Sequence, residues 1–166
     1  MEQSHHDVII VGGGHAGCEA ALAAARMGAR TLLVTISRDS IGRMSCNPAV
    51  GGLAKSQLAR EVDALGGEIA KVTDETGIQF KMLNLKKGPA VHSPRAQVDR
   101  LLYERTMQAH LARCAGLDIV EDAAGGLFTS DRGVAGILGE SGTRYAAPRV
   151  VLTTGTFLRG IIHIGT

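Results

Sequence analysis

Short continuous runs of apolar residues mark two segments near the start of the chain, 7–11 (DVIIV) and 30–35 (RTLLVT). Runs of this kind, bounded by glycine or polar residues, are typical of strands buried on both faces of a parallel sheet. The alanine-rich stretch 15–27 lies between them and predicts a helix that ends at Gly28. Together these segments predict a βαβ unit with a right-handed crossover.

Beyond this unit, the apolar positions follow helical and alternating periods. Ala54, Leu58, Val62 and Leu65 recur at helical spacing and predict an amphipathic helix with these side chains on its buried face. In the segment 77–84 (GIQFKMLN), apolar residues alternate with polar ones. This alternation predicts a strand with one buried face.

A further helix is expected to begin at the Ser-Pro pair formed by Ser93 and Pro94. Serine is a favourable N-cap, and proline is favourable at the first helical position because its missing N–H group needs no partner there. The buried side of this helix is expected to hold the apolar residues Val98, Leu101, Leu102, Ala109 and Ala112.

The last third of the chain predicts strands without further helices. Four short strands are expected near 117–121, 125–130, 134–139 and 143–147, followed by an apolar strand in 149–157 (RVVLTTGTF). The predicted fold class is therefore α/β, a Rossmann-type dinucleotide-binding fold with a parallel sheet, a β-meander over 125–147 and an inserted helical and loop segment. We expect residues 7–40 and 116–166 to form the Rossmann core and residues 41–115, approximately, to form the insertion.

Composition restricts the class of protein. A net charge of +2 and 45% hydrophobic residues are ordinary for a globular protein and too mild to indicate a nucleic-acid partner by charge alone. Cys18, Cys46 and Cys114 are far apart and form no CxxC motif, so we expect no disulfide, no metal site and a cytoplasmic location. No apolar run reaches membrane-spanning length, so no membrane partner is expected. The chain stops on an apolar stretch, LRGIIHIGT, and we expect it to be an incomplete part of a longer protein.

The strongest local motif is Gly12-x-Gly14-x-x-Gly17, which follows a predicted strand and opens a predicted helix. In such a dinucleotide-binding turn the first glycine makes the turn, the second admits a pyrophosphate and the third allows the helix to pack on the strand. The pyrophosphate is then held by the free N–H groups and the positive end of the helix dipole. The alternative is a glycine-rich turn that binds no ligand.

The ribose-binding carboxylate of a dinucleotide fold is missing from its usual place. An Asp or Glu normally ends the second strand, whereas this sequence has Thr35 there and Asp39 as a candidate substitute. A threonine hydroxyl binds a ribose less strongly than a carboxylate does. The sequence therefore favours FAD over NAD at this turn. The late Thr-Thr-Gly after a meander, a pattern of flavoproteins with two dinucleotide domains, agrees with FAD by analogy of fold.

Five further segments resemble one family closely. They are GRMSCNPAVGGLAK (42–55), EVDALGG (61–67), GIQFKMLN (77–84), KGPAVHSPRAQVDR (87–100) and LTTGTFLRGIIHIG (152–165). Together they resemble the N-terminal part of the glucose-inhibited division protein A family, the FAD subunit of the bacterial enzyme that modifies tRNA uridine with a carboxymethylaminomethyl group. The resemblance covers nearly the whole chain and is weakest at 1–6 and 113–145.

The resemblance implies a function for the full-length protein. It implies an enzyme that binds FAD, takes NADH as reductant, works with a GTPase subunit, and adds an aminomethyl-type group at C5 of the wobble uridine of certain tRNAs. A folate carries the one-carbon unit, and the enzyme is a cytosolic homodimer. The NADH site and a helical C-terminal domain of the family have no counterpart in this chain. The alternatives are a FAD-dependent oxidoreductase of small molecules, and a truncated chain that is catalytically inert.

The resemblance also assigns residues. The FAD-binding positions are Gly12, Gly13, Gly14, His15, Ala16, Gly17 and, on a looser alignment, Ala124. Cys46 is the candidate nucleophile, a thiolate that adds to C6 of uracil beside the positive potential of Lys55 and the helix after it. The alternative for Cys46 is a small turn residue that matters for its shape. His15 is expected to start the helix over the cofactor and not to act as an acid or base.

The segment 81–100 is strongly basic. It holds five basic residues and one acidic residue, a local charge of +4, in Lys81, Lys86, Lys87, Arg95, Asp99 and Arg100. We interpret it as a loop that contacts the phosphate of tRNA or of the flavin; the alternative is a solvated basic loop. Its scarcity of aromatic residues argues against base stacking by this segment.

Overall fold

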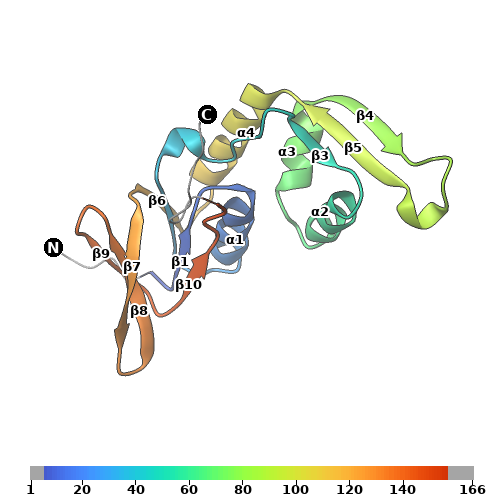
Figure 1. Ribbon diagram of the computed structural model, residues 1–166. Helices are drawn as coiled ribbons and strands as arrows, with labels where there is room; N and C mark the ends of the chain where they lie inside the picture. The colour runs from blue at the N-terminus through green and yellow to red at the C-terminus, as the bar shows by residue number, and fades with distance from the viewer. Residues whose placement is uncertain (1–5, 157–166) are drawn as a thin grey trace, which may run out of the picture.

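The computed structural model describes residues 6–156. Its central element is a parallel sheet with the strand order β10-β1-β2-β6 (Figure 1). These strands are β1 (Val8–Val11), β2 (Thr31–Thr35), β6 (Leu117–Glu121) and β10 (Val150–Leu152). The expected Rossmann-type parallel sheet is confirmed. The apolar stretch LRGIIHIGT at 158–166, on which the expectation of an incomplete chain rests, lies outside the described residues.

The first βαβ unit forms where the apolar runs predict it. Helix α1 (His15–Arg26) joins β1 to β2, and Gly28 ends the turn after it with a φ of 88°, a conformation that favours glycine. Ile10 and Leu33 from the two strands and Leu22 from the helix are almost fully buried in one core cluster. A strand that is covered by another layer on both faces needs apolar residues at every position, which explains the short continuous apolar runs of β1 and β2.

A separate antiparallel meander covers the other side of the parallel sheet. Strands β7 (Ala124–Ser130), β8 (Gly133–Gly139) and β9 (Arg144–Ala146) pair in chain order. Ile137 of β8 packs with Ile9 and Val34 of the parallel sheet in a second core cluster. The predicted meander is confirmed, and it lies beside β1 and β10 in Figure 1.

The long segment between β2 and β6 carries its own sheet, of order β3-β5-β4 (Figure 1). Its antiparallel strands are β3 (Ala49–Gly51), β4 (Gly77–Leu83) and β5 (Ser93–Val98). Helices α2 (Lys55–Ala64) and α3 (Ile69–Thr76) precede β4. Two short 3-10 helices, η1 (Arg38–Ser40) and η2 (Pro89–Val91), lie in the connecting loops.

The prediction that a helix begins at Ser93 was wrong. Residues Ser93–Val98 form strand β5, and helix α4 (Arg100–Ala112) begins later, with the side chain of Asp99 accepting a hydrogen bond from the N–H of Leu102 at 2.9 Å. A Ser-Pro pair is also compatible with extended backbone, and pairing with strands on both sides decided for the strand. Within residues 6–156, α4 and the other helices are too short or too polar to cross a membrane.

Three predicted buried faces were also wrong. On α4, Leu101 and Leu102 are exposed, and Tyr103, Met107 and Leu111 are buried instead. On α2 the side chains of Leu58 and Leu65 are exposed, and on β4 the alternating residues Ile78, Phe80 and Met82 are exposed as well. The periods are real, but a period shows which residues share a face and not what covers that face.

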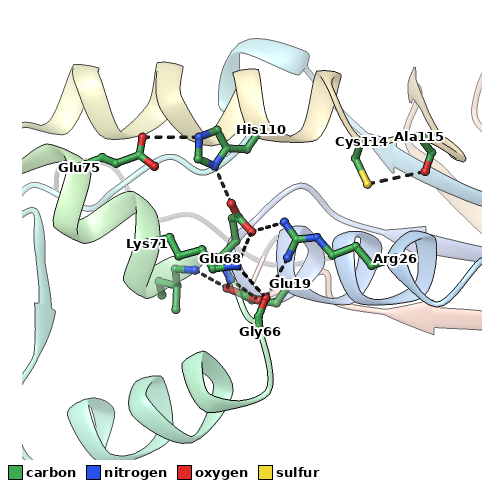
Figure 2. A network of polar contacts seen from close by, with 10 residues as sticks. Glu19, Arg26, Gly66, Glu68, Lys71, Glu75, His110, Cys114 and Ala115 are labelled. Atoms are coloured by element: carbon green, nitrogen blue, oxygen red, sulfur yellow. Dashed lines mark hydrogen bonds and ion pairs between the residues drawn. The ribbon is translucent and has the colours of Figure 1, made fainter.

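A network of polar contacts around Glu68 holds the inserted segment against the parallel-sheet layer (Figure 2). The Glu68 carboxylate, 5% exposed, accepts hydrogen bonds from Arg26 of α1 and from Nδ1 of His110 of α4, the latter at 2.6 Å. The carboxylate of Glu19 in α1 accepts the backbone N–H groups of Glu68 and Ile69. The start of α3 is therefore fixed to α1 and α4 by charged groups and not by apolar packing alone.

Candidate functional site

The glycine turn joins the end of β1 to the start of α1 at the carboxyl edge of the parallel sheet. The N–H of Gly12 donates to the carbonyl oxygen of Val34 at 2.8 Å, and the N–H of Gly42 donates to that of Gly13 at 2.9 Å. Ligands of open α/β sheets bind at this edge. The turn is thus held by β2 on one side and by the start of the 42–52 loop on the other.

The space around each glycine separates three glycines that internal contacts require from one that they do not. A Cβ atom at Gly12 would lie 2.5 Å from the carbonyl oxygen of Thr153, and one at Gly13 would lie 2.7 Å from Oγ1 of Thr35. A Cβ at Gly17 would overlap the carbonyl oxygen of Gly12. These three glycines are required by contacts inside the protein.

Gly14 is different from its neighbours. A Cβ atom there would meet nothing within 4 Å, and its φ of −71° is available to any residue. Neither packing nor backbone strain within residues 6–156 explains a glycine at this position. An open space in front of Gly14 is what a turn needs if its backbone is to approach a pyrophosphate. The second glycine of the motif therefore keeps a cradle free that a side chain would fill.

The N-terminus of α1 faces this open space. Gly14 is its N-cap and has no side chain to accept the helix's first N–H groups. No acidic residue lies in the first turn, so the positive end of the helix dipole is not neutralised locally. The groups that a phosphate needs, free N–H donors and a positive potential, are present at Gly14, His15, Ala16 and Gly17.

His15 begins α1 with an unusual environment. Its ring lies 5.6 Å from that of the fully buried Tyr103, centroid to centroid, and its Nε2 is buried without a hydrogen-bond partner among the described residues. Burial lowers the pKa of His15, and the nearby charge of Lys55 lowers it further. His15 is therefore neutral at pH 7, which agrees with a helix-start residue and not with a fixed positive charge.

Thr153 closes the turn from the far end of the chain. Its backbone N–H follows β10 and donates to Val11, and its hydroxyl donates to the carbonyl oxygens of Val11 and Gly12 at 2.9 and 3.2 Å. The Thr-Thr-Gly segment that was compared with flavoproteins thus lies directly on the glycine turn. This contact is a tertiary one that no local motif could predict.

The candidates for ribose and adenine contacts lie along the same sheet edge. Thr35 is buried at the end of β2, and its hydroxyl donates to the carbonyl oxygen of Ser37 at 3.3 Å. Asp39 is exposed in η1. Ala124 begins β7, close to Asp122, whose N–H donates to the carbonyl oxygen of Thr35. These residues are grouped at the carboxyl edge, but the structure gives no contact that assigns a role among them.

One carboxylate at this edge was not predicted from the sequence: Glu121, at the end of β6. Its side chain accepts a hydrogen bond from the N–H of Arg38 at 2.6 Å, and it pairs in register with Thr35. The only sequence signal was an acid at the end of the strand predicted near 117–121. Because β6 is far from β2 in the sequence, its place beside Thr35 came from the fold.

Cys46 lies exposed in the 42–52 loop, between Gly42, which contacts the glycine turn, and β3. Two cations reach this loop from other elements. Lys55 Nζ donates to the carbonyl oxygen of Ala49 at 3.1 Å, and Arg95 Nη2 donates to Oδ1 of Asn47 at 3.2 Å. The thiol of Cys46 is accessible and does not act as a packed core residue among residues 6–156.

The other two cysteines have no such position. Cys18 is fully buried in α1, and burial, with a further contribution from Glu19, raises the pKa of its thiol to about 12. Cys114 is half-buried just after α4 and contacts the carbonyl oxygen of Ala115. A thiol with a pKa raised this far stays protonated at neutral pH, so Cys18 is inert as a nucleophile.

Comparisons with known proteins place the chain among its relatives. A sequence profile of the family described as Glucose inhibited division protein A matches residues 7–166. The chain is 54% identical over 160 residues to the tRNA uridine 5-carboxymethylaminomethyl modification enzyme MnmG of Protochlamydia amoebophila, and 56% identical over 160 residues to the protein of that name from Geotalea uraniireducens. Each match covers 96% of this chain and 26% of the relative, so the chain spans about a quarter of the length of these curated relatives.

Solved structures agree with this assignment. The form I crystal structure of Aquifex aeolicus GidA matches with a TM-score of 0.92 and 51% identity, over 98% of this chain and 27% of that one. A probable FAD-dependent monooxygenase from Pseudomonas aeruginosa, 18% identical, matches 89% of this chain and 42% of its own with a TM-score of 0.62, and shares the fold alone. Because the profile covers nearly all of the sequence and the high-identity matches agree with it, the chain belongs to the glucose inhibited division protein A family.

Proposed function

We propose that this chain is the FAD-binding part of a longer flavoprotein that modifies the wobble uridine of tRNA. The observation that carries the cofactor assignment is the open space at Gly14, in a turn whose other glycines are required by internal contacts. In this proposal the FAD pyrophosphate is held by the backbone of Gly12, Gly13, Gly14, His15, Ala16 and Gly17, and Ala124 contributes at the adenine side. When bound, FAD supplies two-electron redox chemistry.

The activity proposed for the full-length protein is the addition of a carboxymethylaminomethyl-type group to C5 of the wobble uridine. Family membership and the printed names of the relatives support this activity. The proposal includes NADH as reductant, a GTPase subunit as partner, a homodimer and a cytoplasmic location. It also divides the chain into a Rossmann core at 7–40 and 116–166 with an insertion at 41–115.

Within this function, we assign Cys46 as the nucleophile that activates the uracil. Its thiolate adds to C6, and the electron pair of the 5,6 double bond makes C5 nucleophilic towards the one-carbon unit. Loss of the C5 proton then restores the double bond and expels the thiolate. Two observations support the assignment. Cys46 is exposed, and the side chains of Lys55 and Arg95 donate hydrogen bonds to the same loop.

The test is genetic complementation followed by mass analysis of tRNA nucleosides. The full-length protein that contains this chain is expressed in bacteria that lack their own enzyme of this kind. We expect the carboxymethylaminomethyl-type modification to return, and we expect the purified protein to carry FAD. Protein that folds and carries no flavin would overturn the cofactor assignment. Flavin-loaded protein that leaves the uridine unmodified would overturn the activity.

A further inference from the structure

Two like charges face each other directly across the hairpin formed by β4 and β5. Lys81 and Arg95 are register partners in this antiparallel pair. Side chains at directly opposite positions have Cβ atoms about 5 Å apart, and like charges there destabilise the pair. Neither residue belongs to an ion pair within residues 6–156. The hairpin therefore carries a repulsion that no part of the described chain relieves.

The surrounding sequence offers no acid to neutralise these charges. The segment 77–98 contains four basic residues, Lys81, Lys86, Lys87 and Arg95, and no Asp or Glu. Elsewhere some cations do have an acidic partner: Arg26 with Glu68, Arg30 with Asp7, and Arg100 with Glu104. A hairpin with four basic residues and no acidic residue favours a negatively charged ligand.

The neighbours on the same face are hydrogen-bond donors. Gln79 is the register partner of Gln97, and both share the face of Lys81 and Arg95, because residues two apart on a strand point to the same side. These four side chains, with Leu83, line one shallow depression. Two cations flanked by two amides form a surface suited to phosphate oxygens, which accept hydrogen bonds from both groups.

The opposite face of the hairpin has a different character. Phe80 and Met82 point to that side and line a groove of about 350 Å³, whose far wall comes from α2 and α3. Lys81 and Arg95 also contribute to the lining of this groove, so these two cations border both hollows of the hairpin.

The cationic face leads to the Cys46 loop. Strand β5 lies between β4 and β3, so Arg95 faces Lys81 on one side and pairs with Gly51 of β3 on the other. The Arg95 guanidinium also donates to the side chain of Asn47, which is next to Cys46. In Figure 1 the two strands of the hairpin extend away from the parallel sheet, with β3 at their inner end.

We propose that the face formed by Gln79, Lys81, Arg95 and Gln97 binds the phosphodiester backbone of tRNA next to the nucleotide that reaches Cys46. The inference rests on the proposed function for the identity of the RNA. Phosphate contacts set the position of a nucleic acid and carry no sequence information. The face therefore positions the tRNA, and the choice of uridine is made elsewhere.

The experiment compares two double variants of the full-length protein that contains this chain. Lys81→Gln/Arg95→Gln removes both cations and keeps hydrogen-bonding side chains. Arg105→Gln/Arg132→Gln is the matched control, because it removes the same charge from exposed positions in α4 and after β7 that belong to no ion pair within residues 6–156. The affinity for unmodified tRNA is measured at several salt concentrations.

We expect the hairpin variant to bind tRNA at least about tenfold more weakly at low salt, with a slope of log K against log salt reduced by about two, one for each lost phosphate contact. Its flavin content and its Tm should not fall, since removing two charges that repel each other across the hairpin relieves strain. The control should keep the affinity and slope of the parent protein.

Two results would overturn the inference: an unchanged affinity and salt slope in the hairpin variant, or an equal loss in the control. These outcomes are separate from a failure of the proposed function. If tRNA binding depends on Lys81 and Arg95 but the protein modifies no uridine, the surface stands and the activity falls. If modification is normal and binding ignores the hairpin, the activity stands and the surface falls.

Discussion

The side-chain oxygen of Thr153 lies 3.2 Å from the carbonyl oxygen of Gly12, although 141 positions separate the two residues in the sequence. The same hydroxyl is 2.9 Å from the carbonyl oxygen of Val11. Thr153, which directly follows β10, therefore holds the glycine turn in place from outside the βαβ unit. The turn is finished only when β10 has joined the sheet.

Replacing Thr153 with valine tests this contact. Thr153→Val keeps the shape of the side chain and removes its hydroxyl, so we expect the free energy of unfolding of the chain to fall by about 1 kcal/mol. Urea denaturation followed by circular dichroism measures the change. Thr154→Val is the neighbouring control. An unchanged midpoint for Thr153→Val would show that the hydroxyl does not stabilise the turn.

The glycine turn allows binding and folding to be separated. We expect Gly14→Val to lose FAD in the full-length protein while lowering the free energy of unfolding by no more than about 1 kcal/mol, because its side chain enters open space. Gly17→Ala should instead destabilise the fold, because its Cβ overlaps the carbonyl oxygen of Gly12. Flavin absorbance and thermal unfolding are the two measurements. A Gly14→Val protein that keeps its flavin would contradict the assignment of the cradle.

Cys46 is expected to be reactive and dispensable for folding. In the full-length protein, Cys46→Ala should keep FAD and lower tRNA modification at least about a hundredfold, since a covalent step is removed. Alkylation of the parent protein, without the substitution, at neutral pH should label Cys46. It should leave Cys18 unlabelled, because burial keeps the Cys18 thiol protonated. Normal modified uridine in cells with only the Cys46→Ala protein would return the residue to a structural role.

Glu68 should contribute stability that depends on pH. Burial alone raises the pKa of Glu68, but the hydrogen bonds from Arg26 and His110 outweigh it, so the net pKa is lowered in the folded state. A lowered folded pKa means that the contribution is present above the ordinary value for glutamate and is lost as the pH falls through the folded one. We expect Glu68→Gln to destabilise the chain by about 2 kcal/mol at pH 7.

Glu68→Gln should destabilise the chain less at acid pH than at pH 7. At an acid pH below the ordinary pKa of glutamate, part of this contribution is already lost, so the difference in stability between the parent and Glu68→Gln should shrink. Urea denaturation at the two pH values measures it, with the exposed Glu140→Gln as the control. An equal difference at both pH values would mean that the carboxylate's charge is not what stabilises the network of Figure 2.

The 166-residue chain by itself should self-associate. Leu65 is 89% exposed, and Leu58 and Phe80 are each 61% exposed. Large apolar side chains exposed to solvent favour self-association of the chain, or indicate a surface that another segment or partner covers. We expect size-exclusion chromatography to show oligomers or aggregates, weak FAD retention and no tRNA modification, and Leu58→Gln/Leu65→Gln to shift the chain towards monomer. A monodisperse chain with stoichiometric FAD would contradict this expectation.

Much of the core fold follows from the sequence. The strands of the βαβ unit, the meander and the late strand were all predicted, because apolar runs and glycine turns act over a few neighbouring residues. The glycine turn between β1 and α1 was predicted in the same way, because its path depends on neighbouring residues, and its role in binding a cofactor stays a prediction. What these signals share is that the residues which form the structure are adjacent in the sequence.

Tertiary structure decided the rest. Residues Ser93–Val98 became a strand because β3 and β4 pair with it, and the apolar side of α2 stayed exposed because nothing among residues 6–156 covers it. The placement of Lys81 opposite Arg95 and of Thr153 on Gly12 also needed the fold. Each of these depends on contacts between segments far apart in the chain, where strand register and packing override local preference.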